Sequence, residues 1–245
     1  MTIVVSIKCS DGVVIACDSM LTVNGFVQQI GQKIHILSEL QLFAFSGDLA
    51  LAERFRAIAT VMANHLPQAQ HKLYYATAVG KYLVEDLKST GLDPLNVNLW
   101  TVLCFVKDEA PEVCIFEHGS QPRYLDQDHY TWVIGSGAVA AAPFLKFLID
   151  TLLGNRQPNV AEGKLLATWA VNYSIATMAG GVGMPIDLAT IEKEPNGEWQ
   201  LRELNRSDID EILQAIRSAS DALRRWRDEL ISEKDAEEVP KPENQ

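Results

Sequence analysis

The feature that most constrains this chain is its start, where two apolar runs are joined by a tight turn. Residues 2–8 and 13–18 are rich in β-branched side chains, and residues 10–12 between them read Ser-Asp-Gly, a turn signal. The pattern predicts a β-hairpin that brings Asp18 close to Thr2. Thr2 directly follows the initiator methionine, so removal of that methionine would expose it. An N-terminal threonine carries a hydroxyl nucleophile and its own base, the α-amine.

The composition is that of an ordinary globular protein. The chain has 245 residues, 47% of them apolar and 22% charged, which suits one large domain with a sizeable core. Its formal net charge of −11 argues against nucleic acid as a partner. No run reaches the roughly 20 apolar residues that a membrane span needs, and charges interrupt the first apolar run. We therefore expect neither a membrane span nor a signal peptide.

The cysteines and histidines form no ligand pattern. The four cysteines lie in apolar, strand-like runs without Cys-x-x-Cys spacing, at Cys9, Cys17, Cys104 and Cys114. We expect them to be small buried side chains of a reducing compartment rather than a disulfide framework or zinc site. The histidines also lack metal-ligand spacing. We expect a cytoplasmic protein without a metal or other cofactor.

Apolar periodicity outlines the rest of the chain. It predicts strands at 33–37, 42–46, 99–107, 112–117, 131–135, 186–192 and 199–203, and helices at 49–65, 70–90, 138–154 and 161–178. Strands flanked by pairs of helices predict two sheets face to face with helices outside each. The domain prediction is a body over 1–205, an amphipathic helix over 206–233 capped by Ser207, and a disordered charged tail over 234–245.

Asp18 ends an apolar run, which is costly unless a cation meets its carboxylate. Lys33, which opens the next predicted strand, is the candidate. A lysine beside the nucleophile would lower the pKa of the α-amine, ordinarily about 7.7–8, so that the amine acts as a base at neutral pH. The alternative is an acid at a turn and a solvated lysine at a strand edge.

Two junctions after strands contain glycine. Gly47, after Ser46, stands between a predicted strand and a predicted helix, where unpaired N–H groups can bind an anion or form an oxyanion hole. An ordinary strand-to-helix turn explains the same residues. Ser136 lies between two glycines at the second junction, which is weak evidence by itself.

Together these pieces resemble one known family. Thr2, Asp18, Lys33, Gly47 and Ser136 occur with the order and spacing of the proteasome β-subunit family and its bacterial relatives, and the resemblance covers residues 2 to about 204. In length and in its last helix the chain resembles the bacterial homologues outside the standard proteasome and the heat-shock ring protease, and of these we favour the beta-proteobacterial proteasome homologue. The ancestral β-subunit group is the alternative.

The resemblance implies a fold and a set of roles. The fold would be the α+β, four-layer αββα sandwich of two antiparallel sheets found in N-terminal-nucleophile hydrolases, with an extra C-terminal helix. Thr2 would be the nucleophile, Lys33 the residue that lowers the pKa of the amine, and Asp18 the residue that orients Lys33. Gly47 would supply the oxyanion N–H, and Ser136 would position the amine and its water.

The resemblance also implies substrate contacts. The backbones of Thr22 and Leu49 would hold a peptide as an added strand. The pocket for the residue before the scissile bond would be shaped by Leu21, Gly31, His35, Phe45 and Glu53. Phe45 at its floor predicts a shallow pocket.

One departure from the family pattern concerns the second late helix. The family usually has an aspartate there with a serine three residues later, and the alignment puts Ala176 and Ala179 at these positions. Ser174 and Thr177 are partial hydrogen-bonding substitutes, but neither supplies a carboxylate. The departure implies weak activity or unusual substrates.

The function implied is a threonine-type peptidase subunit. It would form self-compartmentalised double rings of two stacked heptamers that act on unfolded polypeptides or peptides, and the need for an ATPase stays open. The alternatives are a non-catalytic ring or scaffold protein and a small-amide hydrolase of the same fold. The apolar stripes of the predicted helices are either subunit contacts or covers for their own sheets.

Overall fold

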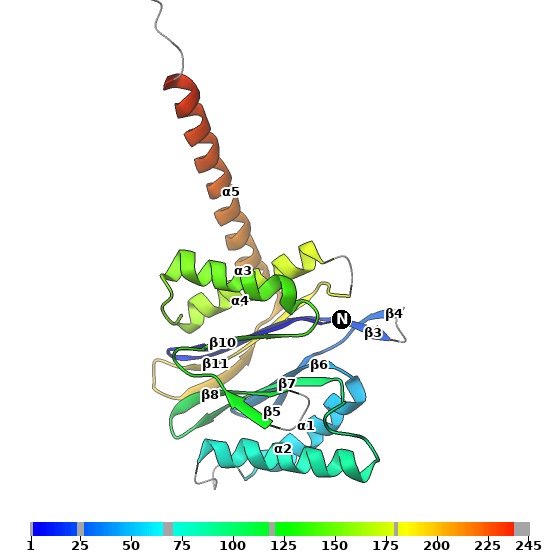
Figure 1. Ribbon diagram of the computed structural model, residues 1–245. Coiled ribbons are helices and arrows are strands. Elements are labelled where there is room, and N and C mark those ends of the chain that lie inside the picture. The colour runs from blue at the N-terminus through cyan, green and yellow to red at the C-terminus, as the bar shows by residue number, and fades with distance from the viewer. Residues whose placement is uncertain (1, 24–26, 66–70, 118–120, 179–180, 238–245) are drawn as a thin grey trace, which may run out of the picture.

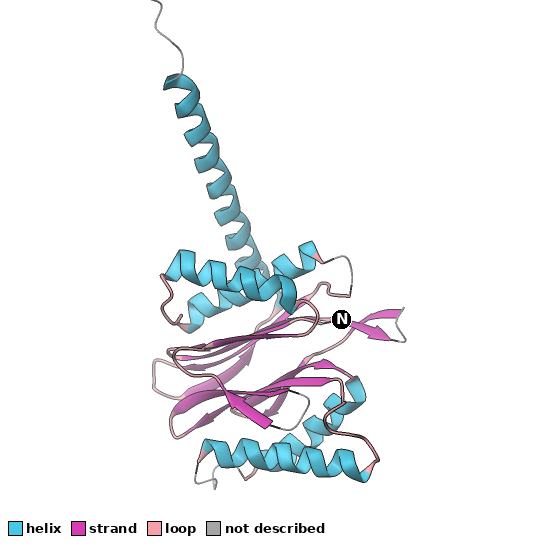
Figure 2. Cartoon of the chain, viewed as in Figure 1, coloured by secondary structure: helices cyan, strands magenta, loops and turns pink. Residues whose placement is uncertain are grey.

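Two five-stranded antiparallel sheets lie face to face between two layers of helices in the computed structural model of this chain (Figures 1 and 2). The structure describes residues 2–23, 27–65, 71–117, 121–178 and 181–237. This arrangement confirms the α+β, four-layer αββα sandwich with an additional C-terminal helix.

The first sheet has the predicted hairpin in it. Its strand order is β10-β1-β2-β11-β12, with β1 at Val4–Cys9, β2 at Gly12–Asp18, β10 at Thr131–Ile134, β11 at Ile186–Lys193 and β12 at Trp199–Glu203. In the hairpin register Val4 pairs with Cys17, so Asp18 reaches the level of Ile3. The Asp18 amide donates a hydrogen bond to the Ile3 carbonyl at 3.3 Å.

The second sheet has the order β5-β6-β7-β8-β9, with β5 at Ile34–Ser38, β6 at Gln41–Gly47, β7 at Leu99–Lys107, β8 at Ala110–Glu117 and β9 at Gln121–Tyr124. A separate ribbon, β3 (Met20–Val23) with β4 (Val27–Ile30), extends beside the N-terminus (Figure 1). The sequence pattern missed β3, β4 and β9. Each has four residues, too few to establish an alternation of apolar and polar side chains.

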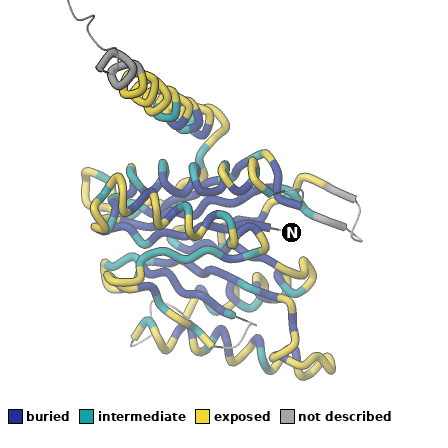
Figure 3. Tube along the Cα trace, turned by 45° about the horizontal axis from the view of Figure 1, so that its top comes forward, coloured by how far each residue is buried: buried dark blue, intermediate teal, exposed yellow. Residues whose placement is uncertain are grey.

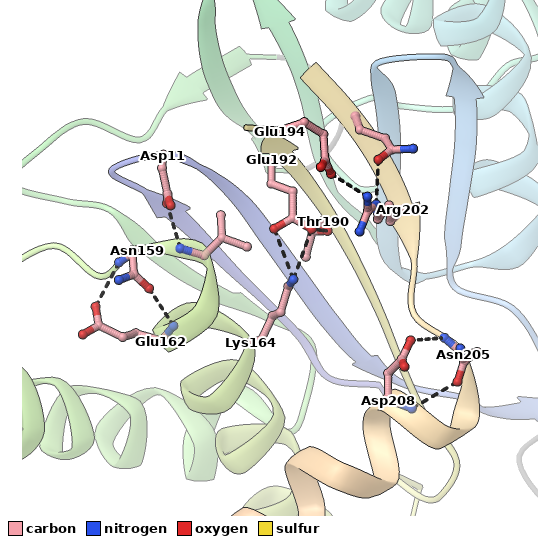
Figure 4. A network of polar contacts seen from close by, with 12 residues as sticks. Asp11, Asn159, Glu162, Lys164, Thr190, Glu192, Glu194, Arg202, Asn205 and Asp208 are labelled. Carbon is pink, nitrogen blue, oxygen red and sulfur yellow. Dashed lines mark hydrogen bonds and ion pairs between the residues drawn. The ribbon is translucent and has the colours of Figure 1, made fainter. Parts of the chain in front are cut away.

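Each outer face is covered by a helix pair. Helices α1 (Leu49–Ala63) and α2 (Lys72–Ser89) lie on the second sheet, and α3 (Ala138–Leu153) and α4 (Val160–Thr177) lie on the first. Asp48 caps α1 by accepting hydrogen bonds from the Ala50 and Leu51 amides. Asn159 and Glu162 form a reciprocal capping box at the start of α4 (Figure 4).

The three apolar layers follow from the alternation of side chains along the strands. In β1, Val5 and Ile7 pack toward α3 and α4, whereas Val4 packs between the sheets. A further cluster, which includes Phe55 and Phe105, lies between the second sheet and α1 and α2. Because β1 and β2 are buried on both faces, their ends are held in fixed positions, and the candidate site lies at these ends.

Helix α5 (Arg206–Glu237) differs from the prediction at both ends. Asn205, not Ser207, caps it: the Asn205 side chain accepts from the Asp208 amide at 3.1 Å, and the Asp208 side chain accepts from the Asn205 amide at 3.3 Å. The helix also continues to Glu237, into the segment predicted to be disordered, while 238–245 lie outside the described residues.

Only the first turns of α5 pack on the body. Ile209, Leu213 and Ile216 are buried, whereas every residue from 221 to 231 is exposed. The helix consequently extends away from the layer formed by α3 and α4 (Figure 3). Among the helices in the described ranges, none has a stretch apolar enough to cross a bilayer.

Candidate active site

A buried ion pair forms the centre of the candidate site. Lys33 Nζ lies 2.6 Å from Asp18 Oδ1, and the side chains are 1% and 0% exposed. Asp18 comes from the last position of β2, and Lys33 from the residue before β5. The pair therefore connects the two sheets. This geometry excludes the alternative of a solvated lysine at a strand edge.

The Asp18 carboxylate has four hydrogen-bond donors around it. Besides Lys33, the Ile3 amide donates to Oδ1 at 2.9 Å, and the amides of Met20 and Gly183 each donate to Oδ2 at 3.2 Å. Backbone N–H groups and an ammonium group together stabilise the ionised carboxylate. Asp18 is thus equipped to fix the position of Lys33 and of the chain beside Thr2.

Thr2 lies at the start of β1, next to this carboxylate. Its backbone nitrogen donates to Ser136 Oγ at 3.3 Å, and its carbonyl accepts from the Gly137 amide at 3.1 Å. In this chain the nitrogen is a peptide N–H, because Met1 precedes it, and it stands in for the α-amine of the processed chain. Met1 itself lies outside the described residues. The structure thus brings Ser136 to the atom on which the predicted general base would reside.

The two glycine junctions meet at Thr2. Gly135 has a φ of +94°, and a Cβ there would lie 2.2 Å from the Thr2 carbonyl oxygen and 3.0 Å from Ser46 Oγ. Gly47, the next residue along β6, has a φ of +117° and is exposed. Close backbone approach therefore requires glycine here and brings the β6–α1 junction beside Thr2.

Ser174, on α4, takes part in the same arrangement. It is completely buried, and its hydroxyl donates to the Gly137 carbonyl at 3.2 Å. Ala176, two residues later, is exposed, and Ala179 lies outside the described residues. Thr177 does not face the site, because its hydroxyl donates to the Tyr173 carbonyl on the helix surface. Of the two substitutes considered from the sequence, only Ser174 contacts the turn that holds Thr2.

Several of the predicted substrate-side residues lie together. His35 stacks on Phe45 with ring centroids 6.0 Å apart, and Phe45 is buried. Leu21 packs over Gly31, where an added Cβ would lie 2.1 Å from Leu21 Cδ1. Burial, followed by the charge of Arg56, lowers the pKa of His35 below its ordinary value. The His35 ring is therefore neutral at pH 7.

The other predicted substrate contacts are located by backbone position alone. Thr22 pairs with Gln28 in the β3–β4 ribbon, and its side chain lies outside the described residues. Leu49 is the first residue of α1 and is 45% exposed, and Glu53, one turn later, is also exposed. Their substrate roles stay predictions.

Sequence reasoning missed one polar cluster beside the site. Ser19 Oγ donates to Asp187 Oδ2 at 2.5 Å, and Arg206 lies 3.5 Å from the same carboxylate. These residues line a cavity of about 360 Å³ between the edges of the two sheets. Ser19 adjoins Asp18, but Asp187 and Arg206 come from distant segments that only the fold brings there. Within the described ranges, no group of three or more acidic, histidine or cysteine side chains is arranged to hold a metal.

Comparison with known proteins gives a family and a fold. A family model described as proteasome subunit matches residues 2–181. Among solved structures, a Gly-1 mutant of Anbu from Hyphomicrobium sp. strain MC1 is similar with a TM-score of 0.68 and 20% sequence identity. The alignment covers 93% of this chain and 97% of that one. No curated protein matches. At this identity the Anbu structure supports the fold and leaves the choice between the two bacterial subgroups open.

Proposed function

Because the chain belongs to the proteasome subunit family, we propose that it is the subunit of a homo-oligomeric threonine peptidase that uses Thr2 once Met1 has been removed. The observation that carries this proposal is the buried Asp18–Lys33 pair beside the Thr2 backbone. A buried ion pair is a weak source of stability, because a well-packed apolar pair often stabilises as well or better. The pair lies at the end of β2, against the N-terminal segment, and this location fits a catalytic role better than a purely structural one.

The proposed reaction begins with activation of Thr2. Its hydroxyl transfers a proton to its own α-amine, directly or through a water, while Oγ attacks the substrate carbonyl carbon. The Lys33 ammonium stabilises the forming alkoxide and lowers the pKa of the amine, as a nearby like charge does. Asp18 holds Lys33 in place, and Ser136 accepts from the amine and orients it.

Bond cleavage and hydrolysis complete the cycle. The tetrahedral intermediate places its negative oxygen at the Gly47 N–H, and collapse breaks the C–N bond as the α-ammonium gives its proton to the leaving amine. The product is an ester on Thr2 Oγ. A water, deprotonated by the α-amine, attacks this ester and releases the acid, which restores the Thr2 hydroxyl.

The proposed assembly is a pair of stacked rings, two heptamers, with Thr2 facing an inner chamber. Its support is the family, whose members generally form oligomeric rings, and the exposed apolar side chains on the helix layers. These include Val139 and Phe147 on α3, at 73% and 57% exposure, and Val61 and Tyr74 on α1 and α2, at 60% and 71%. In the proposed rings these side chains would lie at the contacts between subunits. The substrates would be peptides or unfolded chains, and we leave the need for an ATPase open.

We place this peptidase in the cytoplasm. The four cysteines are free and buried. Burial is the largest cause that raises the pKa of the Cys17 and Cys104 thiols well above the ordinary value. Buried thiols of this kind behave as small apolar side chains, as in reducing compartments.

One observation favours a second candidate function, a ring or scaffold protein without useful turnover. The family's carboxylate on the second late helix is replaced by Ala176, which is exposed. Ser174 supports the turn at Gly137 but brings no negative charge. A small-amide hydrolase of the same fold would use the same nucleophile, so labelling cannot separate it from a peptidase. It is separated by comparing the turnover of small amides with that of peptide amides.

The test is the intact mass of the purified protein before and after treatment with a peptide epoxyketone, which bridges the hydroxyl and the amine of an N-terminal threonine. We expect a chain that begins at Thr2 and gains one label, and no label on Thr2→Ala. Lys33→Met, shown to be folded by circular dichroism, should label far more slowly. If the chain keeps Met1 and takes no label, the peptidase proposal is wrong and the ring or scaffold function remains. Turnover of small amides but not peptide amides would favour the amidase.

A further inference from the structure

Helix α5 carries a stripe of small and apolar side chains that begins against the body and ends in solvent. Its members follow each other at spacings of three or four residues, so they share one face: Ile212, Ala215, Ala219, Leu223, Trp226 and Leu230. Leu223 and Trp226 are each 59% exposed, and Leu230 is 42% exposed. A large apolar stripe on a projecting helix indicates a surface that another protein covers.

A groove lies beside the first turns of the same helix. It measures about 610 Å³ between α4, β12 and α5, and its apolar part is formed by Ala161, Leu165, Leu204, Ile212 and Ala215. Lys164 and Arg202 at its edge are paired with Glu192 and Glu194 (Figure 4). Asp208, Glu203 and Glu211 also line the groove. The groove is therefore apolar inside and has acidic residues along α5.

The spacing of the stripe is symmetric about Ala219. Ala215 and Leu223 lie four residues on either side of it, and Ile212 and Trp226 lie seven residues on either side. Suppose that two α5 helices pair antiparallel about a twofold axis at Ala219. Ala215 of one copy then meets Leu223 of the other, and Ile212, which lines the groove, meets Trp226. A twofold interface requires this self-complementarity, in which residue i meets j and j meets i.

Charged residues flank the stripe on both halves of α5. The base has three acids, Asp208, Asp210 and Glu211, and the projecting half has three arginines, Arg224, Arg225 and Arg227, together with Asp221, Asp228 and Glu229. Arg224 and Arg227 are paired with Asp221 and Asp228. Within the described part of the chain, the side chains of Glu211 and Arg225 have no ion-pair or hydrogen-bond partner.

Glu211 and Arg225 also lie on the same flank of the helix. They are fourteen residues apart in the sequence, which is close to four turns at 3.6 residues a turn. In an antiparallel pair, side chains on one flank meet the same flank of the other helix. Glu211 of one copy would therefore face Arg225 of the other, about two residues apart along the axis.

We propose that α5 binds the α5 of a second copy of this chain, antiparallel about a twofold axis at Ala219. Trp226 of each copy enters the groove at the base of the other α5, and Glu211 pairs with Arg225 of the other copy. Ala215 and Ala219 let the two helices approach closely at the centre. The pairing is independent of catalysis at Thr2 and of ring closure, so either can fail without the other.

Cysteine cross-linking of the full chain tests the orientation. The native cysteines are buried, so unaltered protein is the blank. Under mild oxidation with copper phenanthroline, Ala219→Cys should form a disulfide-linked dimer. Leu230→Cys should not, because two antiparallel copies of residue 230 are about 33 Å apart at 1.5 Å per residue. Arg217→Cys, on the opposite face of α5, should also give no disulfide-linked dimer. Linkage at both 219 and 230 would show a parallel pair, and no linkage at 219 in folded protein would overturn the pairing.

The strength of the pairing is tested by sedimentation velocity over a range of protein concentration. Trp226→Ala should weaken self-association about 30-fold or more, as expected for a buried aromatic anchor. Ile231→Ala is the matched control, since Ile231 is 53% exposed on the same helix but off the stripe, and it should leave association unchanged. Glu211→Arg and Arg225→Glu should each weaken association, and the double variant should restore it. The proposal would be contradicted if the losses caused by Glu211→Arg and Arg225→Glu simply added in the double variant. Equal effects of Trp226→Ala and Ile231→Ala on association would also contradict it.

Discussion

Ser174 Oγ donates a hydrogen bond to the Gly137 carbonyl at 3.2 Å, from a completely buried position on α4. The Gly137 amide in turn donates to the Thr2 carbonyl at 3.1 Å. A hydroxyl on the second late helix therefore fixes the turn that carries Ser136. Its position is two residues before the point where the family usually has a carboxylate. The connection is geometric, because the Ser174 hydroxyl donates to a backbone carbonyl of the turn and reaches Thr2 only through that backbone.

Ser174→Ala should remove the buried hydroxyl that donates to the Gly137 carbonyl, which keeps the amides of Ala140 and Ala141 as donors. We expect a loss of about 0.5–1.5 kcal/mol in the free energy of unfolding and a roughly tenfold slower epoxyketone labelling of Thr2. Thr177→Ala is the control, because its hydroxyl bonds the Tyr173 carbonyl on the helix surface. Chemical denaturation and a labelling time course measure the two effects. If labelling is unchanged while stability falls, Ser174 supports the fold only.

Removing one member of the buried pair should cost more than removing both. Lys33→Met leaves the Asp18 carboxylate buried with three backbone donors and no cation, and we expect a loss of about 3–5 kcal/mol in unfolding free energy. The double variant Asp18→Asn with Lys33→Met has no uncompensated charge, so it should recover part of that stability while labelling of Thr2 stays as slow as in Lys33→Met. Urea titrations of the wild type and three variants give the coupling energy. A double variant less stable than Lys33→Met would refute this account.

The hairpin and the layered fold were predictable because they depend on local patterns. A turn signal between two apolar runs determines the pairing of β1 with β2, and so brings Asp18 to Ile3. Lys33 followed as the cation that opens the next predicted strand and could compensate a buried acid. The positions of Gly47 and Ser136 near Thr2 came from the family resemblance, since nothing local connects residues so far apart in the sequence.

The parts that were missed depend on contacts between distant segments. Gly183 donates to Asp18 from a late loop, and its only sequence signal is a glycine-rich stretch. Asp187 and Arg206 join Ser19 through strand and helix ends that meet only in the folded chain. The cap of α5 was wrong by two residues, because Asn205 and Ser207 both suit the position and only the backbone geometry selects between them.

The ionisation of His35 should make stability depend on pH. Burial lowers its pKa below the ordinary value near 6.5. Between the folded and the unfolded pKa, the unfolded chain binds a proton at this residue and the folded chain does not. The free energy of unfolding must therefore rise with pH through this window and lose this contribution as pH falls below 6.5. The difference between wild type and His35→Gln, measured at pH 5, 6, 7 and 8, should show that slope, and a flat difference would contradict it.

Gly47 and Gly197 form a matched pair for testing how closely the β6–α1 junction is packed. Both have positive φ, +117° and +88°, a conformation that costs an L-residue about 1–2 kcal/mol. A Cβ at Gly197 would meet nothing within 4 Å, whereas at Gly47 it would lie 2.0 Å from the Asn98 carbonyl oxygen. Overpacking of this kind adds about 1–3 kcal/mol.

Gly197→Ala should therefore lower the free energy of unfolding by about 1–2 kcal/mol and leave Thr2 labelling intact. Gly47→Ala should cost roughly 3 kcal/mol or more, and the displaced backbone should slow labelling as well, because its N–H is the proposed oxyanion donor. Urea denaturation and the labelling rate of each variant separate the effects. If Gly47→Ala destabilises the fold but labels at the wild-type rate, the backbone at residue 47 is structural and the oxyanion donor must be sought at another amide.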